Sequence, residues 1–549
     1  MYVDVAVSRQ NGKVYKRVLL RESYKVKGQV KHRTIANLSH CSEEEIQALK
    51  LALKHKGDLH HLDSVKDAVH TKQGLAVGAI ILLQTLADRL HISAALGNSV
   101  DGKFALWQVM ARALNQGSRL SAVRLAGQHA VCDLLTLPSF DEEDLYKNLN
   151  WLATNQGQIE KRLFDRRYQG NAVPRLFLYD VTSSYLEGMH NELGDWGYNR
   201  DGKKGKLQII IGLLTDETGV PVSIEVFKGN TNDPKTVLSQ IQKIARSFGI
   251  SKVTFVGDRG MIKSAQIQDL KAEHFHYITA ITKSQIATLL KQDVFQIEQF
   301  TETLCEIESD GIRYILRRNP QRVEEIAQTR HEKIHKVQRF ITRQNEYLAH
   351  HQRAKVAVAL RKSTQWLQQL KVSEFAHIEA QERHLALTLD AKKHAAISAL
   401  DGCYVIKTEL PQAEVAAETV HQRYKDLAFV EQGFRTIKTG LLETRPIFVR
   451  KEQRTKGHVL VVMLAYILVQ ELQKLWAEMN ITVEEGLLEL SMLTTMEIQI
   501  GHTCYQQIPQ PREVGRKLLE LAQVRLPEAL PSRNIKVATR KKLTRGKKI

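Results

Sequence analysis

The chain begins with alternating apolar and polar residues. Val3, Val5 and Val7 recur at every second position, and a period of two predicts a β-strand. The dipeptide Asn11-Gly12 is a strong signal for a tight hairpin. Residues 1–42 are therefore expected to form a small β-meander.

Between residues 43 and 170 the apolar spacing changes to three or four, which predicts helices. The strongest helical segments are Gly74–Leu90, Lys103–Asn115, Ser121–Leu135 and Asp141–Arg167. The turn Asn115–Arg119 has the length found in helix-turn-helix pairs. This region could read a nucleic acid or could be a plain helical bundle, and the pattern leaves both open.

A β-rich pattern starts at Pro174. The expected strands are Arg175–Ser183, Leu207–Thr215, Val220–Lys228, Lys252–Gly257 and His276–Thr282, and the expected helices are Asp233–Phe248 and Ser264–Ala272. The order β-β-β-α-β-α-β predicts a mixed sheet, in which a meander is followed by parallel strands with helical crossovers. Residues 171–282 are thus expected to form the first part of an α/β core.

Residues 283–404 interrupt this core and are expected to form an insertion domain. Its β-rich ends, Leu304–Arg318 and Leu385–Leu410, flank a long amphipathic helical stretch, Val323–Val372. An insertion with β-rich ends and a helical middle is therefore predicted.

Helical patterns resume afterwards. Residues 405–480 are expected to complete the core, and residues 481–549 to form a helical region with a basic tail. That tail, from Lys536, carries seven Lys or Arg and no acid, so it is expected to be disordered and to bind a polyanion through charge alone. The apolar runs Leu75–Leu83 and Val459–Val469 are too short to cross a bilayer, which needs about 20 residues.

The segment Tyr424–Lys438 has helical composition with one chemically unusual face. Tyr424, Leu427, Glu431, Arg435 and Lys438 are spaced to lie along one side of a single helix. The opposite stripe is expected to be buried and includes Ala428, Val430 and Ile437. An ordinary amphipathic helix with an ion pair between Glu431 and Arg435 explains the pattern. An acid that shares a metal with a phosphate, among phosphate-binding cations, explains it equally well.

Two aspartates favour the second interpretation. Asp180 ends the first predicted strand of the core, and Asp258 follows the buried strand Lys252–Gly257. Carboxylates at such strand ends often cap the next turn. Together with Glu431 on a neighbouring helix, they could instead converge on a pair of Mg²⁺ ions, which prefer oxygen ligands.

Composition indicates the partner. Lys and Arg number 79 and Asp and Glu 60 in 549 residues, for a net charge of +19, which favours a polyanion such as nucleic acid or a membrane surface. The five cysteines are scattered without a CxxC pair, as expected in a reducing cytoplasm. The N-terminus lacks the apolar block of a signal peptide.

Several motifs together resemble bacterial insertion-sequence transposases of the DDE type. They are YDVTSSYLEG around Asp180, KGNTNDPKT at 228–236, FVGDRGM around Asp258, YKDLAFVEQGFRTIKTGLLETRPIF from Tyr424, and NGKVYKRVLL and HRTIANL near the N-terminus. The resemblance covers about residues 1–475. The last core motif is similar to the Tyr-x2-Arg-x3-Glu-x6-Lys signature of the IS-four-type group, with Tyr424, Glu431 and Lys438 at matching positions.

The resemblance implies an RNase H-like α/β core, interrupted by an insertion domain and preceded by a β-meander and a helical region that binds inverted-repeat DNA. It implies that Asp180, Asp258 and Glu431 are catalytic and hold two Mg²⁺, with Mn²⁺ able to replace them. Tyr424 and Lys438 would grip DNA phosphates. The family's Arg position holds Leu427, which cannot do so. Arg423 or Arg435 could take its place, and Arg435 is the one on the expected helical face.

The implied function is transposition of an insertion sequence. The enzyme would bind the terminal inverted repeats, hydrolyse phosphodiesters at the element ends and join the 3′-OH to target DNA. A homodimer bridging two ends, in the bacterial cytoplasm at the nucleoid and without a membrane partner, is expected. An RNase H-like nuclease or resolvase without strand transfer, and a catalytically silent DNA-binding repressor, are the alternatives.

Overall fold

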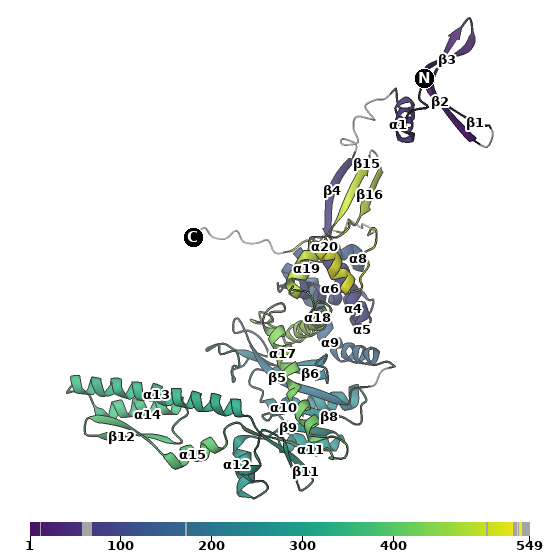
Figure 1. Cartoon of the computed structure of the whole chain (residues 1–549). Coiled ribbons are helices and arrows are strands. Elements are labelled where there is room, and N and C mark those ends of the chain that lie inside the picture. Colours follow the sequence, from purple (N-terminus) through teal and green to yellow (C-terminus); the bar gives the residue numbers. More distant parts are fainter. Residues whose placement is uncertain are drawn as a thin grey trace.

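The computed structural model describes residues 1–10, 13–57, 69–170, 173–500, 503–530, 535 and 537–540. The molecule is elongated (Figure 1). A small N-terminal sheet lies at one end, a narrow strand arm and a helical region follow, and a large sheet lies at the other end. A helical unit projects sideways from the large sheet.

The N-terminal unit is antiparallel, in agreement with its alternating pattern. Its elements are β1 (Tyr2–Gln10), β2 (Lys13–Val26), β3 (Gln29–Asn37) and α1 (Glu43–Lys54). The strands pair in the order β1-β2-β3. A small core of Val18, Leu38 and Ile46 joins the sheet to α1. The predicted Asn11-Gly12 turn lies outside the described residues.

The helical region differs from the predicted segments at two places. Its elements are α4 (Gly78–Arg89), α5 (Ile92–Leu96), α6 (Val100–Leu114), α7 (Arg119–Ala126), α8 (Val131–Leu135) and α9 (Glu142–Arg167). The segment expected as one helix from Gly74 begins as a strand, β4 (Val69–Ala76). The segment expected as one helix from Ser121 is interrupted between α7 and α8.

The large sheet is mixed and has the order β10-β11-β14-β9-β8-β5-β6-β7. Its strands are β5 (Leu176–Tyr185), β6 (Gln208–Asp216), β7 (Pro221–Lys228), β8 (Thr254–Gly257), β9 (His276–Ala280), β10 (Cys305–Ser309), β11 (Ile312–Arg318) and β14 (Cys403–Thr408). The meander β5-β6-β7 is antiparallel, and β5, β8 and β9 are parallel. The mixed α/β sheet predicted for residues 171–282 is thus confirmed.

Helices cover both faces of this sheet. They are α10 (Asp233–Gln242), α11 (Ser264–Ala272), α12 (Lys283–Lys291), α16 (Ala417–Lys425), α17 (Leu427–Lys438) and α18 (Glu452–Leu475). One core contains Leu178 of β5 with residues of α17 and α18. Another contains Phe177 and Tyr179 of β5 with residues of α10 and α11. Because side chains alternate along a strand, β5 contributes to both cores.

The segment between β9 and β14 both extends the sheet and forms the projecting unit. The unit contains α13 (Pro320–His350), α14 (Val356–Gln369), β12 (Ala376–Gln381), β13 (His384–Leu389) and α15 (Ala391–Ala399). It has its own core, which includes Val337, Ile341 and Leu367. The stretch expected to be continuously helical over Val323–Val372 is therefore two helices, with a break after His350.

The C-terminal residues are not purely helical, contrary to the sequence prediction. Besides α19 (Val483–Ser491) and α20 (Glu513–Leu521), they form β15 (Thr494–Ile500) and β16 (Thr503–Gln507). These strands pair with β4 in the order β16-β15-β4 and make the arm in Figure 1. Most of the basic tail, Lys536 and residues 541–549, lies outside the described residues.

Helix α18 is long and apolar enough to cross a membrane by length and composition, with a mean hydropathy of 1.4 over its most apolar window. That window is 72% buried inside the protein, and α18 packs against α9, α6 and β7. Here it is therefore the central helix of the core.

The contact between α9 and α18 gives a stability prediction. A Cβ on Gly457 would lie 2.1 Å from the Leu149 carbonyl oxygen, whereas a Cβ on exposed Gly157 in α9 would meet nothing within 4 Å. We expect Gly457→Ala to destabilise the protein by at least about 1–3 kcal/mol through overpacking. Gly157→Ala should stabilise it by about 0.5–1 kcal/mol through helix propensity. Urea unfolding of the two variants measures both, and equal effects would contradict this packing.

Candidate active site

The register of two parallel strands brings Asp180 and Asp258 together. Strands β5 and β8 are hydrogen-bonded neighbours, and their last paired residues are Tyr179 and Gly257. Asp180 and Asp258 each come next in the chain. Because neighbouring strands lie about 4.8 Å apart, the two aspartates lie side by side. Asp258 follows the end of β8, as predicted. Asp180 does not end its strand as predicted, because β5 continues to Tyr185 and Asp180 pairs with Leu213 of β6.

The strand period also determines which face they occupy. Leu178 and Val256 belong to the core shared with α17. Asp180 and Asp258 are two residues further along the same chains, so they point to the same side. Helix α17 crosses that side and contacts β5 and β6. The two aspartates therefore face the helix that carries Glu431.

A cavity of about 390 Å³ lies between these elements. Its lining contains both acids and cations. The acids are Asp180, Asp201, Asp233, Asp258 and Glu431, and the cations are Arg200, Arg435, Lys438 and Arg445. The uncharged lining residues are Val181, Thr182, Met261, Phe434 and Thr439. Asp258, Glu431 and Arg435 are exposed, and Asp180 is partly buried. The cavity thus brings together acids that are distant in sequence, including the three predicted ones.

Asp180 is the most perturbed of the acids. Burial is the main cause that raises the pKa of Asp180 to about 7, and the negative charges of Asp258 and Glu431 add to it. A hydrogen bond from the Val181 N–H and the charge of Arg200 act in the opposite direction. A carboxylate with this surplus of negative charge around it suits a divalent cation with oxygen ligands. Among the described residues, no three acidic, histidine or cysteine side chains already form a metal-binding cluster. The donor chemistry fits such ions, and ion binding would need the acids to draw closer.

Asp258 receives hydrogen bonds at one oxygen. The backbone N–H of Arg259 donates to its Oδ1 at 2.7 Å, and the Tyr424 hydroxyl donates to the same atom at 3.1 Å. Burial and the charge of Asp258 both raise the pKa of Tyr424, which keeps the phenol protonated as a donor. Tyr424 therefore orients the Asp258 carboxylate in this state.

The expectation of one continuous helix over Tyr424–Lys438 is wrong. Helix α16 ends at Lys425 and α17 begins at Leu427, so Tyr424 reaches the site from a different helix than Glu431. Leu427 is buried in the core, whereas Glu431, one turn further along α17, is exposed. Of the opposite stripe, Val430 and Ile437 are buried, but Ala428 is exposed.

Lys438 is buried and already paired. Its Nζ lies 2.6 Å from Asp201 Oδ1 and donates to Thr182 Oγ1 at 2.9 Å. Asp201 also pairs with Arg445 and accepts from the Tyr185 N–H at 3.1 Å. Burial lowers the pKa of Lys438, while Asp201 raises it. Lys438 is thus one member of a buried ionic network beneath the cavity.

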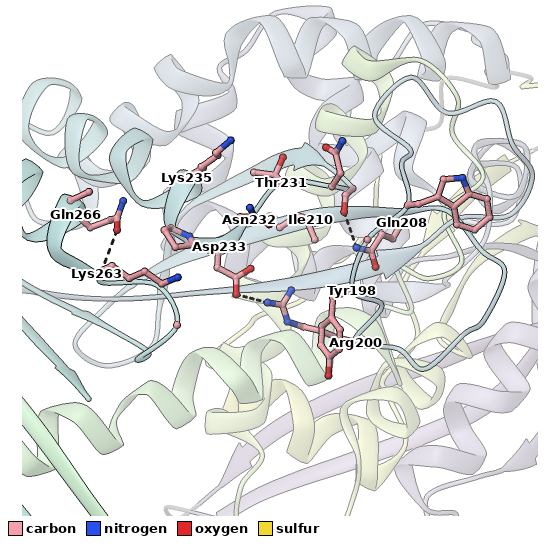
Figure 2. Close-up of a pocket in the computed structure, with 17 residues that line it drawn as sticks. Tyr198, Arg200, Gln208, Ile210, Thr231, Asn232, Asp233, Lys235, Lys263 and Gln266 are labelled. Carbon is pink, nitrogen blue, oxygen red and sulfur yellow. Dashed lines mark hydrogen bonds and ion pairs between the residues drawn. The ribbon is translucent and has the colours of Figure 1, made fainter. Parts of the chain in front are cut away.

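Sequence reasoning missed the contribution of the loop between β5 and β6. Arg200 and Asp201 come from this loop, and Arg200 Nη2 lies 2.6 Å from Asp233 Oδ2, an ion pair visible in Figure 2. The available signals were an Arg-Asp pair within the Gly- and Lys-rich segment 194–206 and the motif KGNTNDPKT. Arg445, also missed, lies in the segment between α17 and α18.

A second pocket, of about 890 Å³, adjoins the cavity and shares Arg200 and Asp233 with it. Figure 2 shows it lined by Tyr198, Lys235, Lys263 and several amides. Trp196 and Tyr198 on its loop are 55% and 84% exposed. Exposed aromatic rings beside cations suit the stacking of nucleic-acid bases.

Comparison with known families agrees with this chemistry. Residues 171–468 match the family described as transposase DDE domain. Residues 4–62 match the N-terminal domain of the IS1634 family transposases. The first match includes Asp180, Asp258 and Glu431. The narrower IS-four-type assignment stays a prediction.

The solved structures that are similar are distant. A piggyBac transposase synaptic complex with hairpin DNA shares 10% identity at a TM-score of 0.34, covering 77% of this chain and 70% of that one. A Mos1 transposase paired-end complex shares 11% identity at a TM-score of 0.15, covering 27% of this chain and 52% of that one. No curated protein matches the chain. Because the DDE domain match extends over more than half of the sequence, and the N-terminal match is to a transposase family as well, this chain belongs to the DDE transposases and is the transposase of an insertion sequence.

Proposed function

We propose that this transposase binds the terminal inverted repeats of its element, hydrolyses a phosphodiester at each end and joins the resulting 3′-OH to target DNA. The observation that carries the proposal is a single cavity lined by Asp180, Asp258 and Glu431 together with Arg435. Acids bind metal and cations bind phosphate, and phosphodiester cleavage needs both.

Asp180, Asp258 and Glu431 would hold two divalent ions, Mg²⁺ or Mn²⁺. When bound, such ions supply an activated water and neutralise charge on the phosphodiester. The Tyr424 hydroxyl keeps Asp258 oriented by its hydrogen bond. Exposed Arg435, one helical turn beyond Glu431, would hold a phosphate at the mouth of the cavity. Lys438, which also lines the cavity, would add positive electrostatic potential that favours a DNA phosphate there.

The other parts of the chain receive proposed roles. Residues 171–282 and 405–480 form an RNase H-like core, for which the strand order β7-β6-β5-β8-β9 is the support. Residues 43–170 bind the inverted repeats, with residues 1–42 beside them, and residues 283–404 are an insertion domain. Residues 481–549 add the C-terminal helices and the basic tail. The enzyme acts as a homodimer on DNA in the bacterial cytoplasm, at the nucleoid.

A strand-transfer assay tests this function. Duplexes with the element's ends exposed as 3′-OH are incubated with a supercoiled plasmid and Mg²⁺, and joined products are counted. Joining that stops when EDTA removes the metal is the expected result. Cleavage without joining would indicate a nuclease or resolvase. Binding that is independent of metal, with no nicking, would indicate a repressor.

Arg435 offers a separate test of the DNA contact. We expect Arg435→Gln to weaken binding to an element-end duplex by about 10–100-fold, since a hydrogen bond to a charged group contributes about 1.5–3 kcal/mol. The slope of log affinity against log salt should fall by about one. Arg246→Gln is the control, because Arg246 is exposed and follows α10 on the opposite face of the sheet. Equal losses in both variants would remove Arg435 from the contact.

A further inference from the structure

A third cavity, of about 250 Å³, is lined by basic side chains and by none of the three predicted acids. It is enclosed by the turn between α6 and α7, the segment 443–449 after α17, and the start of α18. Its charged or titratable lining residues are Arg112, Arg119, Tyr146, Glu443, Arg445 and His458. Of these residues, Arg445 also lines the catalytic cavity, and the others have no role in the active site described above.

Two guanidinium groups are buried here without carboxylate partners. Arg112 and Arg119 are each only 5% exposed. Arg112 Nη1 donates to the Gln116 carbonyl at 2.6 Å, and Arg119 Nη1 donates to the side-chain oxygen of Gln108. Both acceptors are neutral, and within the described residues Arg112 Nε has no hydrogen-bond partner. A buried charge whose hydrogen-bond acceptors are neutral is costly, so these two guanidinium groups favour an anion in this cavity.

The electrostatics agree with a surplus of positive charge. Burial and the neighbouring Arg119 lower the pKa of Arg112 to about 9, while Glu443 raises it. Burial lowers the pKa of Arg119 to about 10. Burial and the charges of Arg112 and Arg119 hold the pKa of His458 well below its ordinary value. Arg445 is paired with Asp201, and the lining holds one carboxylate, Glu443, whose charge acts on Arg112.

The backbone adds to the same potential. Gly117 and Ser118 line the cavity at the N-terminus of α7, where Ser118 is the N-cap and accepts a hydrogen bond from the Ser121 N–H. A helix N-terminus carries partial positive charge and favours phosphate. The two buried arginines and the N-terminus of α7 thus line one small space.

We propose that this cavity binds a phosphate group of the DNA backbone, at a second point of attachment outside the catalytic cavity. This assignment rests on the proposed function. Arg445 lines both cavities, so it connects the DNA contact to the active site. A free phosphate ion offers the same chemistry, and the two sources are separated by experiment.

The first experiment uses inorganic phosphate alone. Thermal unfolding of the full chain is followed in phosphate and in chloride at equal ionic strength. Wild type should gain about 2–4 °C at saturating phosphate. Arg112→Met should lose this gain, and Arg124→Met, which changes an exposed residue of α7, should keep it. No gain in wild type, or an equal gain in Arg112→Met, would overturn the anion site. If Arg112→Met does not fold, Arg119→Met replaces it.

The second experiment tests the source. Element-end duplexes carrying one neutral methylphosphonate at a time are bound by the full chain without metal, so that cleavage plays no part. One position should weaken wild-type binding about tenfold and leave Arg112→Met unaffected. If phosphate stabilises the protein but no position behaves in this way, the cavity takes a free anion and the DNA assignment is overturned. Neither readout depends on catalysis, so failure here is distinct from failure of the proposed function.

Discussion

Asp258→Asn should abolish cleavage of element ends while leaving end binding largely intact. The substitution keeps the shape of the side chain and removes the charge beside Asp180 that a divalent ion needs. Metal ions contribute several kcal/mol to such transition states, and each 1.36 kcal/mol is a factor of ten, so we expect a loss of at least about a thousandfold. Single-turnover cleavage of a labelled end measures it, and a mobility-shift titration measures binding.

Asp165→Asn is the matched control. Asp165 is exposed on α9 and pairs with Lys161 on the same helix, so cleavage should stay near the wild-type rate. Mg²⁺-dependent cleavage by Asp258→Asn at the control's rate would refute the assignment of the three acids.

Asp201→Asn should destabilise the catalytic sheet by about 3–5 kcal/mol, the usual effect of removing one partner from a buried ion pair. The Asp201 side chain is 1% exposed and pairs with Lys438, which is 10% exposed, and with Arg445. Its loss leaves two cations facing each other without a counter-charge. Native-state hydrogen exchange should show faster opening of β5 and α17, including the Tyr185 amide that Asp201 accepts from.

A double-mutant cycle separates this network from general damage. In the variant that combines Asp201→Asn with Lys438→Met, one unpaired cation is gone, so part of the lost protection should return. Lys204→Ala, at an exposed position of the same loop, should not change exchange in β5. Additive losses in the double variant would mean that Asp201 and Lys438 are not coupled.

Much of the core could be predicted from local patterns. The order of strands and helices over residues 171–282 follows from apolar runs and turn residues that lie within each element. The arm could not be predicted in this way. Strand β4 was missed, and its end was included in the helix predicted from Gly74, because its partner β15 begins at Thr494. Local spacing carries no information about a partner so far away.

The three acids could be predicted because each one lies in or next to an element with a recognisable pattern. Asp180 lies in β5, Asp258 follows β8 and Glu431 lies in α17, and all three line one cavity. The network around Asp201 was missed because a charged residue in a Gly-rich loop resembles any solvated charge. Its importance comes from burial, which tertiary structure creates. The break at Asp426 was missed because it is a small departure from a helix: the backbone of Asp426 stays in the right-handed helical region, and no Gly or Pro marks it in the sequence.

The pairing of β4 with β15 has a consequence for biogenesis. Ribosomes add about 5–20 residues per second, so β4 emerges on the order of tens of seconds before the strand that completes its sheet. During this interval its edge lacks a partner from its own chain. A nascent or prematurely terminated polypeptide lacking residues after about 493 would therefore keep this edge open to chaperones, and a product that includes β15 would close it.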